Sequence, residues 1–293
     1  MSASRLAPVS LLRGDGDGPA VICLHSTGSS SRQWSRLAER LSPRFRVIPV
    51  DLIAHGRSRP WNRGEAPSID AELEALSALV RSQPGAVHVV GHSYGGAVAL
   101  RLAMRHPDRI STVTAFEPVM FRQLLDAFPD SEAALEAVRV GGSVHGSLAG
   151  GRPEEAARCF YDYWSGAGAW LALDDKARQA ITERMPAALA CFQALFADRT
   201  PREAIARLEI PVLLMSGGRS PASGRAATKL LADLLPRSWW TSFEELGHMG
   251  PVEAPEIVNP AIARFLDAAH RRSVALRPQD SGSFPRWGAS AMA

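Results

Sequence analysis

The chain has 293 residues, of which 46% are hydrophobic and 22% charged, and this composition excludes an intrinsically disordered protein. Lysine and arginine exceed aspartate and glutamate by only 33 to 30. Nucleic-acid binding requires clustered basic side chains, and the only short basic run is His270-Arg271-Arg272, so the sequence predicts no nucleic-acid partner.

Short apolar runs alternate with longer amphipathic stretches along the chain. The runs predict strands at residues 20–24, 45–50, 87–90, 110–116, 212–215 and 239–243. The stretches predict helices at residues 32–41, 69–81, 94–105, 226–235 and 255–269. Strands separated by helices are typical of parallel pairing, because each crossover needs a helix's length of chain. The pattern therefore predicts an α/β fold with a doubly wound, mostly parallel sheet.

The stretch from about 121 to 206 interrupts this alternation. It contains no good strand candidate, has helical patterns at 154–164 and 176–196, and is rich in aromatic residues. We expect a helical insertion on the strand ends, with the glycine-rich stretch 141–151 as a flexible loop. The predicted organisation is a core of residues 1–120 and 206–272, an inserted helical lid of residues 121–205, and a frayed C-terminal tail of residues 273–293.

The strongest functional motif is Gly91-His92-Ser93-Tyr94-Gly95, between a predicted strand and a predicted helix. Gly-x-Ser-x-Gly in this context forms a strained strand-to-helix turn that exposes the serine hydroxyl. Side chains in place of Gly91 and Gly95 would collide with the crowded turn. The N–H of Tyr94 lies at a helix N-terminus, where a developing oxyanion is stabilised. The motif predicts Ser93 as a nucleophile and Tyr94 as an oxyanion donor.

A serine nucleophile needs a general base. Of the eight histidines, His248 is the candidate, because it follows the last predicted strand and nearby glycines let its loop fold over the strand ends. The alternative is an exposed loop histidine. The small-residue loop at 25–30 offers a second oxyanion donor, for which the N–H of Thr27 is best placed. This loop can also be a serine-rich turn that caps the next helix.

These motifs resemble those of the alpha/beta-hydrolase family, in the family's order. The segments 25–28, 51–58, 91–95 and 247–249 carry the resemblance, which covers residues from about 8 to 120 and 206 to 270. It implies the alpha/beta-hydrolase fold with a helical lid and a serine–histidine–acid triad. Ser26 and Ala54 stand where glycine is common in the family.

The position of the acid departs from the family's usual pattern. Many members carry an aspartate after the strand that follows the lid, whereas residues 215–221 contain no carboxylate. Some relatives place the acid one strand earlier, where Glu117 ends a predicted strand. The resemblance therefore implies that Glu117 orients His248 and stabilises its imidazolium. The alternative is a charge at a helix start or a lid hinge.

We therefore expect a serine hydrolase that cleaves a carboxylic ester, thioester or lactone of a small, fairly hydrophobic substrate through an acyl-enzyme on Ser93. Carbon–carbon bond hydrolases, acyltransferases and cofactor-free haloperoxidases use similar triads and are alternatives. A non-catalytic ligand-binding scaffold is an alternative of another class, supported by the missing aspartate.

The sequence predicts no metal or nucleotide cofactor, because it has neither a Cys/His ligand cluster nor a Gly-x-x-x-x-Gly-Lys loop. Three cysteines, Cys23, Cys159 and Cys191, have no metal-like spacing, and an odd number favours a reducing compartment. No apolar run approaches the roughly 18 residues of a membrane span, and no signal peptide is visible. We expect a cytoplasmic protein without a membrane partner, and no residue pattern indicates its oligomeric state.

Overall fold

The computed structural model describes residues 18–62 and 64–275, with side chains up to residue 271. Its six strands form one sheet in the order β2-β1-β3-β4-β5-β6, in which every neighbouring pair is parallel. The strands are β1 (Ala20–Leu24), β2 (Arg46–Val50), β3 (Val87–His92), β4 (Ile110–Phe116), β5 (Val212–Gly217) and β6 (Ser238–Phe243). The predicted α/β class with a parallel sheet is confirmed. The frayed tail predicted for residues 273–293 lies almost entirely outside the described residues.

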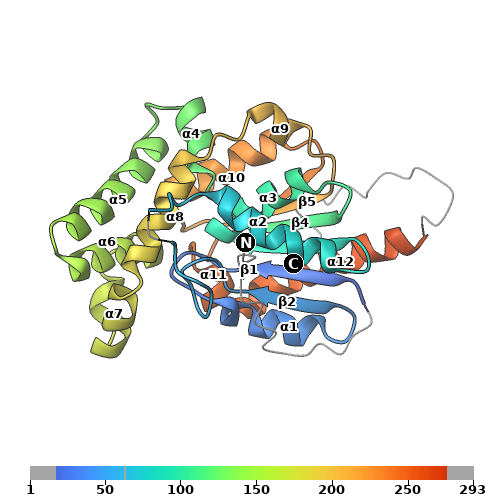
Figure 1. Ribbon diagram of the computed structural model, residues 1–293, viewed down its shortest axis with the longest axis horizontal. Helices are drawn as coiled ribbons and strands as arrows, with labels where there is room; N and C mark the ends of the chain where they lie inside the picture. The colour runs from blue at the N-terminus through green and yellow to red at the C-terminus, as the bar shows by residue number, and fades with distance from the viewer. Residues whose placement is uncertain (1–17, 63, 276–293) are drawn as a thin grey trace.

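Helices cover both faces of the sheet (Figure 1). One face packs against α1 (Ser35–Leu41) and α12 (Pro255–Ala275), and the other against α2 (Ile69–Ser82), α3 (Tyr94–Arg105) and α10 (Ala222–Leu234). Successive residues of β1 alternate between the two cores, since Ile22 lies in one and Cys23 in the other. This alternation is what a strand buried on both faces requires.

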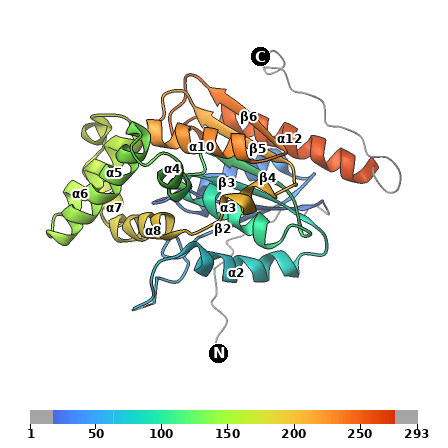
Figure 2. The ribbon, with the colours of Figure 1, turned by 90° about the horizontal axis from the view of Figure 1, so that it is seen from above.

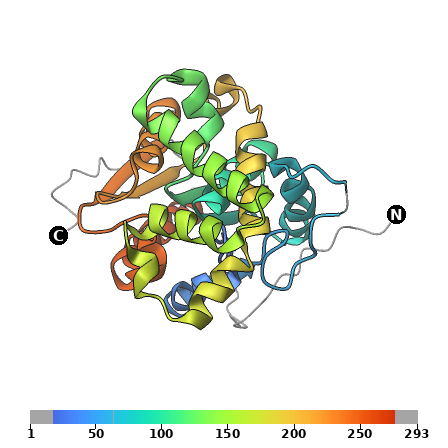
Figure 3. The ribbon, with the colours of Figure 1, turned by 90° about the vertical axis from the view of Figure 1, so that its left-hand side faces the viewer.

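A segment of helices joins β4 to β5, and we call it the helical insertion. It contains α4 (Phe121–Ala127), α5 (Glu132–Ala149), α6 (Pro153–Ser165), the short turn η2 (Ala169–Ala172), α7 (Asp175–Thr182), α8 (Met185–Ala197) and α9 (Arg202–Ala206). Most of these helices gather beside one end of the sheet (Figures 1 and 2). Viewed from that side, they lie in front of the strands (Figure 3).

The prediction of a flexible loop at residues 141–151 is wrong, because most of this stretch forms the C-terminal half of α5. Gly141 is buried where α5 meets α8, and a Cβ there would lie 2.7 Å from Cε2 of Phe196. The glycine therefore allows close packing of two helices rather than a flexible turn. The turn itself comes later, at Gly151, where φ is +69°. Similarly, the single helical pattern at 176–196 forms two helices, α7 and α8.

The strand order reverses beside β1, and this reversal positions the candidate site. The chain passes from β1 outward to β2 and then returns to the other side of β1 as β3. Ligands of open parallel sheets bind outside the carboxyl ends of the strands at such a reversal. The loops that follow β1 and β3 meet closely here, since a Cβ at Gly95 would lie 2.4 Å from the carbonyl oxygen of Leu24.

Candidate active site

Ser93 occupies the turn between β3 and α3. Its φ of +56° and ψ of −119° lie in a region that residues with a side chain rarely adopt. The turn is held by a hydrogen bond from the Ser93 N–H to the carbonyl of Phe116 at 2.9 Å. Glycine leaves space around it, because a Cβ at Gly91 would lie 2.4 Å from the carbonyl oxygen of Gly95. This is the local geometry that the Gly-x-Ser-x-Gly motif predicts.

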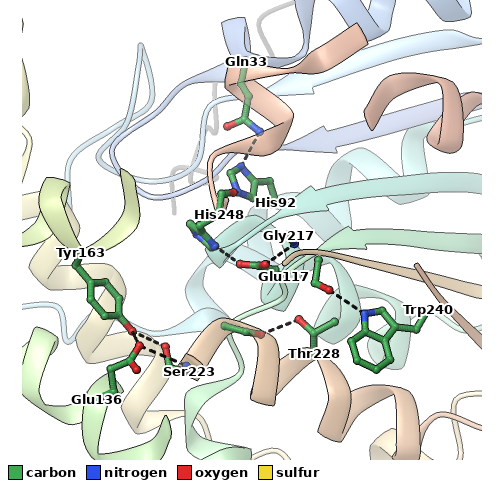
Figure 4. Close-up of polar contacts among 12 residues, drawn as sticks. Gln33, His92, Glu117, Glu136, Tyr163, Gly217, Ser223, Thr228, Trp240 and His248 are labelled. Carbon is green, nitrogen blue, oxygen red and sulfur yellow. Dashed lines mark hydrogen bonds and ion pairs between the residues drawn. The ribbon is translucent and has the colours of Figure 1, made fainter. Parts of the chain in front are cut away.

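His248 follows β6 and contacts the carboxylate of Glu117, which follows β4 (Figure 4). The distance from His248 Nδ1 to Glu117 Oε2 is 2.5 Å, and both side chains are buried. The other carboxylate oxygen accepts the N–H of Gly217 at 2.8 Å. Because both carboxylate oxygens are engaged, Glu117 is fixed in one orientation toward the imidazole.

Gly217 and Gly224 support this contact, and sequence reasoning missed both. Gly217 ends β5, so a backbone N–H stands near the place where many relatives carry the acid. A Cβ at Gly224, on α10, would lie 2.9 Å from Oε2 of Glu117 and 3.9 Å from Nδ1 of His248. The available sequence signal was that Gly217 and Gly224 follow the strand predicted at residues 212–215, after which the expected carboxylate is missing.

A chain of hydrogen bonds connects the backbone of His248 through His92 to Gln33 (Figure 4). From Gln33 the chain continues to the loop after β1. Nε2 of His92 donates to the carbonyl of His248 at 2.8 Å, and Nδ1 of His92 accepts from Nε2 of Gln33 at 3.1 Å. Oε1 of Gln33 accepts from the N–H and the hydroxyl of Ser26, each at 3.1 Å. Burial, with the nearby His248, holds the pKa of His92 well below its usual range. The ring therefore stays neutral, as this donor–acceptor pattern requires.

Two further buried histidines hold the loop after β1. Nδ1 of His25 donates to the carbonyl of Ser26 at 2.7 Å, and its Nε2 accepts the N–H of Leu52 at 3.1 Å. Nε2 of His55 accepts the N–H of Gly28 at 3.0 Å. Burial lowers the pKa of His25 to about 3 and also lowers the pKa of His55. Both rings are therefore neutral and able to accept these hydrogen bonds near pH 7.

Thr27 lies in this loop and lines the cavity beside Ser93. The N–H groups of Ser26, Gly28 and Ser29 are already hydrogen-bonded, at 3.1, 3.0 and 3.1 Å. Among these four described amides, the one of Thr27 is left for a ligand. The N–H of Tyr94 is the first in α3, and the first amides of a helix have no partner inside it. These two amides can therefore donate to an oxyanion.

Ser93, His248 and Thr27 line a cavity of about 250 Å³. More than half of its lining residues belong to the helical insertion, and most of these have apolar side chains, including Phe121, Phe160, Tyr161, Ile181, Met185 and Phe192. Arg184, at the start of α8, donates to the carbonyl of Gly28 at 3.1 Å and so links the insertion to the loop after β1.

Trp164 of α6 is a further cavity residue, and its indole stacks on the imidazole of His248. The ring centroids are 3.8 Å apart, with 29° between the planes. Sequence reasoning identified an aromatic insertion but not this contact, because a helical pattern does not indicate which distant ring a residue meets.

Within residues 18–62 and 64–275, no group of three His, Cys, Asp or Glu residues lies close enough to hold a metal ion. Over the same ranges, no helix combines the length and apolar character needed to cross a membrane.

Comparison with known proteins gives matches over most of the chain. A family model for the alpha/beta hydrolase fold matches residues 19–255. The pimeloyl-[acyl-carrier protein] methyl ester esterase of Chromobacterium violaceum is 30% identical over 236 residues, which span 80% of this chain and 88% of that protein. Lipase LipV of Mycobacterium tuberculosis is 42% identical over 119 residues, 38% of this chain and 44% of that protein.

Solved structures agree with the match to the family model. An esterase from Thermogutta terrifontis superposes with a TM-score of 0.65 and 26% identity, covering 87% of this chain and 92% of that one. An esterase from Exiguobacterium antarcticum, at 16% identity and a TM-score of 0.70, shows the same fold over 86% of this chain and 93% of that one. The parallel sheet, the strand-to-helix turn at Ser93 and the match over residues 19–255 lead to one conclusion: this chain belongs to the alpha/beta-hydrolase fold family.

Proposed function

We propose that this protein is a serine hydrolase that cleaves carboxylic esters of small, fairly hydrophobic substrates. The observation that carries the proposal is the 2.5 Å contact between Glu117 and His248, beside a cavity that Ser93 lines. A buried carboxylate at Nδ1 selects the imidazole tautomer whose Nε2 is free to accept a proton. A serine hydroxyl becomes an effective nucleophile only with such a base.

In the proposed reaction, Oγ of Ser93 attacks the ester carbonyl carbon while Nε2 of His248 takes the hydroxyl proton. Glu117 stabilises the resulting imidazolium, and the N–H groups of Thr27 and Tyr94 bind the oxyanion. Collapse of the intermediate transfers the proton from His248 to the leaving alcohol and leaves an acyl group on Ser93. Water then attacks this acyl-enzyme, giving a proton to His248. Release of the carboxylic acid returns that proton to Ser93.

The cavity supports a small substrate with an apolar acyl group. Its volume of about 250 Å³ is modest, and apolar walls with a few polar groups are typical of small-molecule sites. The methyl ester esterase of Chromobacterium violaceum supports an ester with a small leaving alcohol. Thioesters and lactones react through the same steps and belong to the same proposal.

We propose that the helical insertion, residues 121–205, is a lid over a core of residues 1–120 and 206–272. Its apolar side chains line the cavity beside Ser93, and an apolar lid excludes water from the reacting ester.

A cytoplasmic location is also part of the proposal. The support for it is the odd number of cysteines, Cys23, Cys159 and Cys191, which favours a reducing compartment.

A panel of p-nitrophenyl esters with acyl chains of graded length, extended to thioesters and lactones, tests the function. We expect hydrolysis of the shorter esters, loss of that activity in Ser93→Ala, and labelling of Ser93 by a fluorophosphonate probe. A protein that neither hydrolyses these compounds nor reacts with the probe would instead be a non-catalytic scaffold. Faster cleavage of a carbon–carbon bond, faster acyl transfer to an alcohol than to water, or peroxide-dependent halogenation would favour the corresponding alternative.

A further inference from the structure

The helical insertion contributes an aromatic ring to the surroundings of the candidate base. Trp164, near the end of α6, is only 7% exposed. Its ring lies against His248 with centroids 3.8 Å apart and the two planes within 29° of parallel. The imidazole is therefore in face contact with a residue from outside the sheet.

This contact changes in strength when His248 takes a proton. The face of an aromatic ring attracts a cation, and tryptophan does so most strongly. Only 2% of the His248 side chain is exposed, so water screens the attraction little. In the proposed mechanism the imidazole is charged only after it takes the proton of Ser93. An interaction that is stronger in the transition state than in the ground state raises kcat.

We propose that Trp164 is a positioning residue of the catalytic base, which holds the imidazole of His248 and stabilises its protonated form. This inference rests on the proposed function, because it gives Trp164 a part in the proton transfer from Ser93. It also makes the correct docking of the helical insertion a condition of full activity.

The neighbouring residue, Tyr163, anchors α6 in the required place (Figure 4). Its hydroxyl donates to Oε1 of Glu136 on α5 at 2.7 Å and is hydrogen-bonded to Oγ of Ser223 on α10 at 2.5 Å. Burial raises the pKa of Tyr163 well above its usual value, so the hydroxyl keeps its proton. The Tyr163 ring also meets the indole of Trp164 nearly edge-on, at 4.6 Å between centroids. A core helix is thereby joined to the ring that covers His248.

Among the residues that the structure describes, three other ionisable groups interact with the imidazole of His248. Oε2 of Glu117 lies 2.5 Å from Nδ1, and the neutral ring of His92 lies 5.0 Å away between centroids. On α11 (Gly250–Glu253), the carboxyl of Glu253 has its pKa raised by burial and lowered in part by His248. Substitution of Trp164 leaves all three in place, so a series of Trp164 variants isolates the effect of the indole.

Steady-state kinetics provide the first test. Trp164→Leu is expected to lower kcat for a p-nitrophenyl ester by about tenfold to thirtyfold, with a smaller change in KM. Trp164→Phe keeps a smaller aromatic face and is expected to recover most of this loss. Trp170→Leu is the matched control, because Trp170 is also buried in the same insertion but does not line the cavity. An equal loss of kcat in Trp170→Leu would assign the effect to packing of the insertion and overturn the proposal.

Tyr163→Phe provides a second kinetic test. It removes the hydroxyl that bonds Glu136 and Ser223 but keeps the ring that touches Trp164. We expect kcat to fall by about threefold to tenfold, because α6 is less firmly held over His248. In a Trp164→Leu background the same change should have little further effect, since the stack is already lost. Independent, multiplying losses would contradict the proposed anchor.

Tryptophan fluorescence reports on the contact between Trp164 and His248 without any enzymatic turnover. A protonated imidazole in contact with an indole quenches its emission, so emission of the wild type should rise as His248 loses its proton. Trp164→Phe and His248→Gln should both lack this step. Failure of the wild type to hydrolyse any ester would overturn the proposed function and, with it, the role of Trp164. Ester hydrolysis together with an unchanged emission step in Trp164→Phe would overturn the role of Trp164 alone.

Discussion

The two sides of the candidate site are held by different kinds of contact. On the sheet side, His25, His55 and His92 are each hydrogen-bonded through both ring nitrogens. On the side of the helical insertion, the cavity wall is mostly stacked or apolar, as where Phe121 and Phe192 lie nearly parallel. Hydrogen bonds depend steeply on direction, whereas apolar contacts tolerate changes of shape at constant volume. The sheet side is thus suited to fixing the positions of the atoms in the proposed reaction. The insertion is suited to selecting the substrate and to adjusting the surroundings of His248.

The largest effect should come from removing the hydroxyl of the proposed nucleophile on the sheet side. Ser93→Ala is expected to lower kcat by about 10⁴-fold or more, because the bond to the acyl group can no longer form. The fold should be intact, since alanine is smaller than serine. Steady-state ester hydrolysis with circular dichroism as a control measures this. A folded variant that is still a competent esterase would exclude an acyl-enzyme on Ser93.

The next largest effect should come from the proposed triad acid, Glu117. Glu117→Gln keeps a hydrogen bond to His248 but favours the wrong imidazole tautomer and removes the counter-charge. We expect kcat to fall by at least about a hundredfold, with KM little changed.

Ser220→Ala is the control for that measurement. Ser220 lies in the loop where many relatives carry the acid, and its buried Oγ has no hydrogen-bond partner in the described structure. Its removal should keep kcat within about tenfold of wild type. An active Glu117→Gln, or an inactive Ser220→Ala, would contradict the assignment of the acid.

Features determined by neighbouring residues could be predicted from the sequence. The bounds of β1, α3 and β4 agree with prediction because apolar periodicity is local. The turn at Ser93 was also predictable, since Gly91 and Gly95 lie two residues on either side of it and a Cβ at Gly91 would collide with the carbonyl oxygen of Gly95. The catalytic roles given to the site residues stay predictions until they are tested by substitution.

Features that depend on distant segments could not be predicted. The glycine-rich half of α5 resembles a loop in sequence, and only its packing against Phe196 explains Gly141. The contact between Trp164 and His248 likewise joins two elements whose relative position no periodicity specifies. Gly224 makes room for the Glu117 carboxylate from a third element. Contacts between distant segments are therefore the less predictable features on both sides of the site.

A smaller effect should follow from breaking a support rather than a reacting group. His92→Leu removes the donor to the buried carbonyl of His248 and the acceptor for Gln33. An unsatisfied buried group costs about 1–3 kcal/mol, so we expect kcat to fall by about tenfold as the His248 loop shifts. Gln33→Leu should act through the same chain, and the double variant should lose little more. Strictly multiplying losses would show that the two residues are not coupled.

The smallest effect on catalysis, and a measurable one on stability, is expected at Glu72 on α2. This carboxyl group is fully buried, and each of its two oxygens lies 3.2 Å from the backbone nitrogen of Ile53, whose N–H they accept. The hydroxyl of Tyr94 donates to the same group at 3.4 Å. Burial raises the pKa of Glu72 to about 8. The group is therefore a neutral acid near pH 7, buried behind Tyr94, which follows Ser93 in the chain.

This raised pKa predicts how stability depends on pH. In the unfolded chain Glu72 ionises near its ordinary value of 4.5, whereas in the folded protein it ionises near 8. Between these values the folded state binds more protons, so the Glu72 contribution to the free energy of unfolding is full below about 4.5, falls as pH rises toward about 8, and then levels off.

Glu72→Gln stays neutral and keeps an acceptor for Ile53. Urea unfolding measures this pH dependence. As the pH rises from about 6 to 8, the free energy of unfolding of Glu72→Gln relative to that of the wild type should increase by about 1 kcal/mol per pH unit. A difference between the two proteins that does not change with pH would mean that Glu72 ionises in the folded protein as it does in the unfolded chain.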